Sequence, residues 1–170
     1  ELICAAVSSE CGEAPFLTDD ASGATGSLDG EPDNEWSLHR AYGLRRYASV
    51  PTVALDTFLN KIAPHRRILL KIDVEGSEHR VFDGARRVLT ECRPIVQVEC
   101  FTPSKLAGLE RAGYAIFDVG ESGNHVGIPI EHVAARKLVE SLCLARVPPT
   151  TDAQRGFDTQ ARDATTPKPS

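Results

Sequence analysis

The sequence lacks several features that would place it outside the ordinary soluble proteins. Its five cysteines are an odd number, with no C-x-x-C pair and no metal-type spacing, which argues against a disulfide framework or a zinc site. No apolar run reaches the roughly 18 to 20 residues of a membrane span, and no signal peptide is visible. These absences predict a reduced, cytoplasmic protein without a membrane partner.

Methionine is absent altogether. Because translation ordinarily begins with methionine, the sequence predicts that further residues precede Glu1. Basic residues are also in the minority, since 19 Lys and Arg against 24 Asp and Glu give a net charge of -5. Nucleic-acid binding is therefore not expected. The length of 170 residues and the apolar content of 41% fit one globular domain.

The most informative stretch is residues 68–78, where a short apolar strand leads directly into a helix. The apolar period switches from that of a strand to that of a helix at Glu75 and Gly76. After the helix, a second strand follows over residues 94–101. Such strand, helix and strand units are right-handed in nearly all known cases, so the two strands are expected to be parallel. Ligands of open α/β sheets bind beyond the carboxyl ends of such strands.

The rest of the chain reads as alternating strands and helices. Strands are expected over residues 2–7, 14–17, 47–53 and 114–119. Helices are expected over residues 55–62, 77–92, 103–112 and 130–145. Residues 120–127 are expected to form a polar turn. The apolar residues expected to face inward on the last helix are Ile130, Val133, Ala134, Leu138 and Leu142.

Two segments are expected to lie outside the regular elements. Residues 18–45 are rich in Asp, Ser, Gly, Pro and Asn, which predicts a long loop. That loop is a candidate lid or specificity element, or a segment with no such role. Residues 147–170 have almost no apolar content and are predicted to be a disordered tail. The expected domain is therefore residues 1–146.

Acidic residues end both of the predicted parallel strands. Side chains alternate along a strand, so Lys71, Asp73 and Glu75 are expected on one side, with Glu99 ending the neighbouring strand. Parallel neighbours lie about 4.8 Å apart, so Asp73 and Glu99 can approach each other. Their repulsion would be relieved by a divalent cation, a shared proton, Lys71 or a polar substrate. A raised pKa on one acid would suit a general base.

A structural role is the alternative for several of these residues. Glu75 and Glu78 could simply complement the positive end of the following helix, with Ser77 as its cap. Gly76 suits a tight turn or a close approach of the backbone to a ligand, and Gly84 suits close packing of the helix on the sheet. The sequence has no P-loop, no nucleophile elbow and no G-x-G-x-x-G after a strand.

The string Leu70-Lys71-Ile72-Asp73-Val74-Glu75-Gly76-Ser77-Glu78, followed by Pro94-Ile95-Val96 and Glu99, closely resembles the FkbM family of S-adenosylmethionine-dependent methyltransferases. The likeness covers about residues 2–99. It implies a Rossmann-like class I sheet and methyl transfer to oxygen on a small molecule or sugar. Asp73 would be the catalytic or metal-binding acid, with Glu75 and Glu99 as further catalytic candidates. Ala5 and Ala6, in the likeness of the third strand, would lie beside S-adenosylmethionine.

One departure from that family pattern is an absence. Such enzymes bind the cofactor on a glycine-rich loop after the first strand and an acid after the second, and neither is present here. In the strand order 3-2-1-4-5-7-6, the first two strands would be missing and the central strand would have an open edge. The chain alone is then expected to be marginally stable and to bind S-adenosylmethionine weakly. The alternative is a non-catalytic binding module, and the oligomeric state stays open.

Overall fold

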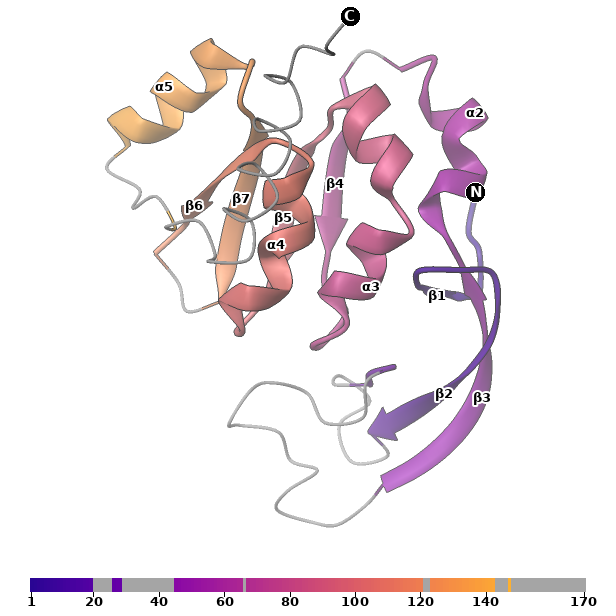
Figure 1. Cartoon of the computed structure of the whole chain (residues 1–170). Helices are drawn as coiled ribbons and strands as arrows, with labels where there is room; N and C mark the ends of the chain where they lie inside the picture. Colours follow the sequence, from indigo (N-terminus) through magenta and orange to yellow (C-terminus); the bar gives the residue numbers. More distant parts are fainter. Residues whose placement is uncertain (20–25, 29–44, 66, 121–122, 143–146, 148–170) are drawn as a thin grey trace, which may run out of the picture.

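The computed structural model describes residues 1–19, 26–28, 45–65, 67–120, 123–142 and 147. Over these residues the chain forms two separate β-sheets and several short helices (Figure 1). This mixture of strands and helices fits the α/β fold that the resemblance implies. The predicted loop over residues 18–45 and the predicted tail over residues 147–170 lie largely outside the described residues.

The larger sheet has the strand order β4-β5-β7-β6. Its strands are β4 (Leu69–Ile72), β5 (Ile95–Glu99), β6 (Tyr114–Asp118) and β7 (Asn124–Pro129). β4 and β5 are parallel, as predicted from the crossover, whereas β7 runs antiparallel to both β5 and β6. This order matches the 4-5-7-6 part of the strand order that the resemblance implies.

The smaller sheet has the order β1-β3-β2, with β1 (Ala6–Val7) parallel to β3 (Arg45–Val53). β2 (Gly12–Asp19) pairs antiparallel with β3 along its whole length. The two long strands form a ribbon that extends beyond the larger sheet (Figure 1). The predicted strands over residues 14–17 and 47–53 are confirmed and are longer than expected.

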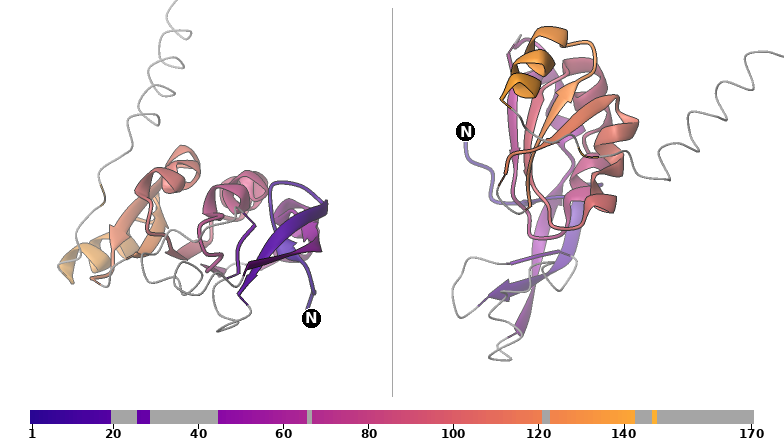
Figure 2. Two further views of the ribbon diagram at one scale, coloured as in Figure 1. Left: turned by 90° about the horizontal axis from the view of Figure 1, so that it is seen from below. Right: turned by 90° about the vertical axis from the view of Figure 1, so that its left-hand side faces the viewer.

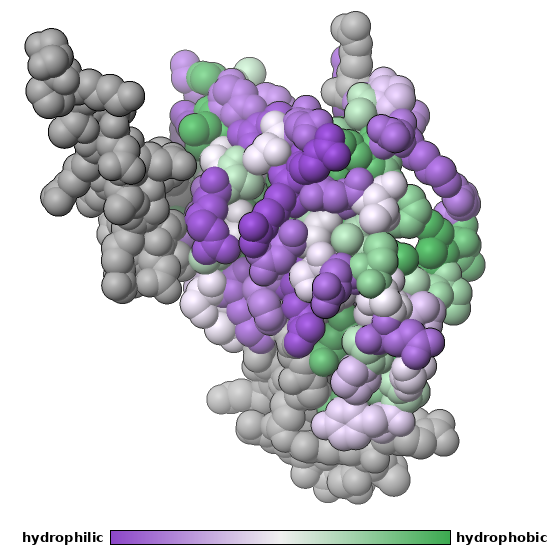
Figure 3. All heavy atoms as spheres, turned by 45° about the vertical axis from the view of Figure 1, so that its right-hand side comes forward, coloured by the Kyte–Doolittle hydropathy of each residue, from purple (hydrophilic) through white to green (hydrophobic). Residues whose placement is uncertain are grey.

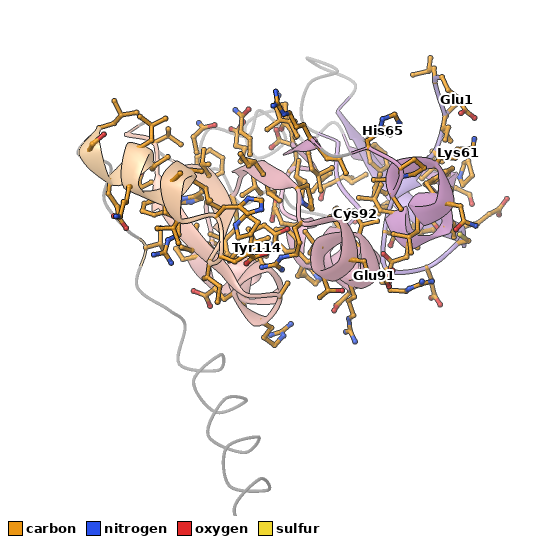
Figure 4. All side chains as sticks on the ribbon, turned by 90° about the horizontal axis from the view of Figure 1, so that it is seen from above. Glu1, Lys61, His65, Glu91, Cys92 and Tyr114 are labelled. Atoms are coloured by element: carbon orange, nitrogen blue, oxygen red, sulfur yellow. The ribbon has the colours of Figure 1, made fainter. Side chains whose placement is uncertain are left out.

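The predicted strand over residues 2–7 is wrong for most of its length. Only Ala6 and Val7 pair with β3, and Leu2 is 96% exposed. An apolar pattern alone cannot form a strand without a neighbour that completes its hydrogen bonds. The first residue is instead held by an ion pair between Glu1 and Lys61, 2.8 Å apart (Figure 4).

Short helices cover both faces of the larger sheet. They are α2 (Leu59–Ile62), α3 (Glu78–Asp83), α4 (Ala107–Arg111) and α5 (Val133–Ser141). The 3-10 turns Leu55–Phe58 and Pro103–Leu106 lead into α2 and α4, and a π-helical segment, Val88–Cys92, follows α3. Figure 2 shows α3 and α4 on one face of the sheet and α5 on the other.

The main core lies between the sheet and the layer of α3 and α4. Its most buried large side chains include Val81, Phe82, Leu89, Val96, Val98, Leu106 and Leu109. A smaller cluster of Ala115, Phe117 and Ile128 packs under α5. Burial of an aliphatic or aromatic side chain contributes about 1.5–3 kcal/mol, so the first cluster is the main source of stability.

The predicted helix over residues 77–92 is interrupted at Gly84. The backbone of Gly84 lies so close to Ser8 that a Cβ atom there would overlap the Ser8 carbonyl oxygen. The second helical segment is capped from another element, because the Asp56 carboxylate accepts hydrogen bonds from the backbone N–H groups of Arg87 and Val88 at 3.0 and 2.9 Å. The close packing predicted for Gly84 is confirmed, and this residue lies between the two helical segments.

Replacing Gly84 with alanine should destabilise the protein by about 3 kcal/mol, because the added methyl group must displace backbone rather than a flexible side chain. Denaturant unfolding would measure the loss. Gly12→Ala is the matched control, since a Cβ at Gly12 meets only Thr52 Oγ1, at 3.9 Å. Equal stability of the two variants would contradict the close contact at Gly84.

The predicted polar turn over residues 120–127 is wrong for its second half, because β7 begins at Asn124, whereas Gly120 and Gly123 lie in bend and turn conformations. Glycine and polar residues gave this strand the composition of a turn. Gly127 sits where the Leu109 side chain lies close against the strand, and a Cβ there would meet Leu109 Cδ2. The glycine therefore marks a close approach of α4 to the sheet rather than a turn.

The inward face predicted for the last helix is wrong. All five residues expected to face inward are exposed, with Leu138 63% and Leu142 64% exposed. Ala135 and Val139 pack against the cluster under α5 instead. The apolar patch of the sheet beneath α5 is small, and the helix turns Ala135 and Val139 toward it rather than its larger apolar side chains.

Arg93 joins the π-helical segment, the residues that follow α4 and the turn before α5. Its guanidinium group donates to three backbone carbonyl oxygens, at 2.6–3.1 Å: those of Leu89, Ala112 and Gly113. It also forms two hydrogen bonds with Glu131 and stacks 4.8 Å from the centre of the Tyr114 ring. The hydrogen bonds from Arg93 lower the pKa of Glu131 to about 2.

Candidate functional site

The candidate site is the edge of the larger sheet where β4 and β5 end. Ile72 of β4 pairs with Val98 of β5. The next residues, Asp73 and Glu99, therefore lie next to each other at the ends of the two strands. Sequence reasoning placed these two acids together, and the register agrees. Together with Glu75, two residues beyond Asp73, they are called the acidic edge below.

The strand register also adds residues that the sequence did not single out. Glu99 pairs with Asn124 of β7, and Lys71 pairs with Gln97 of β5. These side chains lie on the same face of the sheet as α5, but α5 packs over β6 and β7 rather than over β4. Half-buried amide groups therefore flank the acids. Asn124 escaped notice because its segment was assigned to a turn.

Asp73 has one ion-pair partner in the described part of the chain. Its carboxylate accepts a hydrogen bond from Lys71 at 3.0 Å, and the side chains of Asp73 and Lys71 are 40% and 61% exposed. Lys71 was one of the groups expected to relieve repulsion between the acids. An exposed pair of this kind contributes at most about 1 kcal/mol.

The turn after Asp73 has an unusual backbone. Glu75 has φ +50° and Gly76 has φ +98°, so two successive residues are left-handed. For a residue other than glycine this costs about 1–2 kcal/mol. Such strain concentrates at functional sites, where the surrounding structure holds it. The turn predicted at Gly76 is therefore present, and Glu75 shares its conformation.

The predicted cap of α3 is wrong, because the Ser77 side chain makes no capping hydrogen bond. Its hydroxyl lies 3.2 Å from that of Ser27 instead, and both residues are buried. Ser27 belongs to the short described part of the predicted loop, where it also bridges to Leu17 of β2. That part of the loop thus contacts the turn beside the acidic edge.

Glu78 lies in the first turn of α3, as the structural alternative expected, but it is buried. It is 1% exposed, and its Oε1 atom accepts a hydrogen bond from the backbone N–H of Gly76 at 2.8 Å. Its Oε2 atom has no hydrogen-bond partner among the described residues. No sequence signal separated this buried glutamate from a solvated one.

Cys100, which follows Glu99, is not a nucleophile. Burial raises the pKa of its thiol to about 12, and the nearby charge of Glu78 adds to the rise. A thiol with such a pKa stays protonated at neutral pH and is unreactive. Its Sγ atom donates to the carbonyl oxygen of Thr102 at 3.2 Å, which ties the end of β5 to the turn before α4.

Ala5 and Ala6, the predicted cofactor residues, line an open groove of about 440 Å³ between the first residues and β3. Its other lining residues are Leu2, Ile3, Cys4, Phe16, Val50 and Pro51. Figure 3 shows hydrophobic surface gathered on this side of the molecule. The groove could contact the flat face of an adenine ring, but its lining has no carboxylate for ribose hydroxyl groups. These residues therefore fit S-adenosylmethionine only in part.

Metal binding at Asp73 is not supported. Among the described residues, no group of three or more His, Cys, Asp or Glu side chains is placed to hold a metal ion. Asp73 is engaged with Lys71 instead. Within the same residues, no helix is long and apolar enough to cross a membrane.

Comparison with known protein families identifies the family of this chain. Residues 2–126 match the model of the Methyltransferase FkbM domain. The chain belongs to the FkbM methyltransferase family. The matched segment holds the whole acidic edge of this FkbM domain and ends within β7. The family resemblance of the string around Asp73 is thereby confirmed. Searches of curated proteins and of solved structures gave no match.

Proposed function

We propose that this chain is part of an S-adenosylmethionine-dependent methyltransferase that acts on a hydroxyl oxygen of a small molecule or sugar. The observation that carries the proposal is that Asp73 and Glu99 are neighbours at the ends of two parallel strands, in a chain of the FkbM family. Ligands of open α/β sheets bind at this edge. The protein is further proposed to act in the cytoplasm, in keeping with the free cysteines of the described residues.

In this proposal Asp73 is the general base. A hydroxyl group that receives a methyl group must lose its proton, and the exposed carboxylate of Asp73 can accept it. Glu75 and Glu99 would orient the acceptor through hydrogen bonds to its other hydroxyl groups. Several acceptor oxygens at one edge suit a polyol or sugar better than an apolar alcohol. S-adenosylmethionine, when bound, would supply the methyl group.

The proposal includes further strands that complete the domain. β4 is at the edge of its sheet among the described strands, and Leu69 on it is 70% exposed. An unpaired apolar strand edge is a surface that another strand can cover. Residues beyond those described here would then supply the acid and the glycine-rich loop that the groove at Ala5 and Ala6 lacks.

The test compares the 170-residue chain with the complete protein that contains it. Calorimetric titration with S-adenosylmethionine should give a dissociation constant in the micromolar range for the complete protein and very weak binding for the chain alone. Tight one-to-one binding by the chain alone would contradict the need for further strands.

A second measurement separates an enzyme from the non-catalytic alternative. The complete protein should transfer a labelled methyl group from S-adenosylmethionine to a hydroxyl group in a panel of sugars and small alcohols. Binding of the cofactor without transfer to any acceptor in a broad panel would favour a binding module derived from a methyltransferase fold.

A further inference from the structure

In the turn beside the acidic edge, both backbone polar groups of Gly76 form hydrogen bonds with charged side chains. The backbone N–H of Gly76 donates to Glu78 Oε1 at 2.8 Å, and the carbonyl oxygen of Gly76 accepts from Lys105 Nζ at 2.6 Å. Hydrogen bonds with a charged partner are about twice as strong as neutral ones. Gly76 is thus held by an acid and a base from two different elements.

These two partners come from different elements. Glu78 opens α3, directly after the turn, whereas Lys105 lies in the 3-10 turn that follows β5. The contact of Lys105 with Gly76 therefore links the segment after β5 to the segment after β4. Within the segment after β5, the Cys100 thiol donates to the Thr102 carbonyl oxygen just before that turn.

The arrangement has a cost in stability that packing alone does not explain. Glu78 is 1% exposed and leaves one carboxylate oxygen without a hydrogen bond among the described residues. An unsatisfied buried polar atom is unfavourable, because it has lost its hydrogen bonds to water. Left-handed Glu75 adds to this cost at the same turn. Costs of this kind persist where a fixed geometry serves a function.

We propose that Lys105 and Glu78 are positioning residues. They bind the carbonyl oxygen and the N–H of Gly76 and so hold the side chains of the acidic edge in the geometry that the acceptor requires. With Gly76 held, Glu75 keeps its left-handed backbone, and Asp73 keeps its place beside Glu99. This inference rests on the function proposed above. It assigns roles to two residues that do not themselves touch the acceptor.

The proposal is tested by methyl transfer with the Lys105→Met variant of the complete protein. Misplacement of catalytic groups by about 1 Å can lower the rate about 100-fold. We expect kcat to fall 10- to 100-fold with the KM for the acceptor changed less than threefold, and Lys105→Arg to recover most of the rate. Lys61→Met is the control, since that exposed lysine pairs with Glu1 and should keep the wild-type rate. An unchanged kcat, or a raised KM alone, would overturn the proposal.

Amide hydrogen exchange at Gly76 separates this inference from the proposed function. If the wild-type protein transfers no methyl group, the proposed function fails, but exchange still tests whether Glu78 and Lys105 hold Gly76. Exchange of the Gly76 amide should be at least tenfold faster in Glu78→Ala, which loses the acceptor atom, and faster in Lys105→Met than in Lys61→Met. Wild-type exchange rates in both Glu78→Ala and Lys105→Met would show that these two side chains do not hold Gly76, and would overturn the inference.

Discussion

Asp73→Asn in the complete protein should lower the rate of methyl transfer about 100-fold or more, because the amide cannot accept the proton that the acceptor hydroxyl group loses. General bases contribute about 10²- to 10⁴-fold to enzymatic rates, so the loss is large compared with experimental error. The substitution keeps the size and shape of the side chain. It removes the ion pair with Lys71, which is exposed and contributes little to stability. The fold should therefore survive while the activity is lost.

Asp83→Asn is the matched control for this experiment. Asp83 ends α3, and its carboxylate forms an exposed ion pair with Arg86 rather than lying at the acidic edge. The same chemical change there should leave kcat/KM within twofold of the wild-type value. If Asp73→Asn retains a rate similar to that of Asp83→Asn, Asp73 is not the base. Glu99 would then be the next acid to replace.

Arg93→Ala should destabilise the protein by about 3–4 kcal/mol, the largest effect on stability that we expect from a single side chain outside the hydrophobic core. The variant loses three hydrogen bonds to backbone carbonyl oxygens and leaves Glu131 without its partner. The carbonyl oxygens of Leu89 and Gly113 keep a bond from the Tyr114 hydroxyl and the Ile130 N–H, whereas that of Ala112 loses the bond from Arg93. Removing a partner from a partly buried group costs the desolvation of whatever remains unpaired. With about 2–4 °C per kcal/mol for a protein of this size, the melting temperature should fall by about 6–16 °C.

Arg87→Ala is the control, because its ion pair with Glu91 is exposed and spans four residues of one helix. Such a pair contributes less than about 0.5 kcal/mol. The pH dependence provides a second check. The pKa of Glu131 is lowered from 4.5 to about 2 in the folded protein, so its stabilising pair with Arg93 is complete above pH 4.5 and is lost as the pH falls toward 2. The difference between the wild type and Arg93→Ala should shrink over that range. A difference that stays constant would contradict the role of the pair.

The sequence predicted the centre of the fold better than its margins. β4, the crossover and β5 were predicted because a switch of apolar period and a parallel connection are local and handed features. β7 was missed because its glycine and polar residues resemble a turn, and only antiparallel pairing with β5 and β6 reveals it as a strand. α5 was found, but its predicted orientation was wrong, because Ala135 and Val139 pack on the apolar cluster beneath it and the five predicted residues are exposed.

The candidate site shows the same division. Asp73 and Glu99 could be placed together because alternation and parallel pairing fix which residues reach a strand end. Glu78 could not be recognised as buried, since an acid in the first turn of a helix is most often solvated. Nor could Lys105 be recognised, because 29 residues separate it from the Gly76 carbonyl group that it binds.

The amino-acid sequence by itself determined the family, the central strand, helix and strand unit, and the acids at its edge. These follow from motif, period and handedness, which act over short stretches of chain. Only the tertiary structure decided that the turn at Glu75 and Gly76 is left-handed, and that Glu78 and Lys105 bind the N–H and the carbonyl oxygen of Gly76. The physical reason is that burial and long-range hydrogen bonds depend on which segments pack together, and no local pattern of residues encodes that choice.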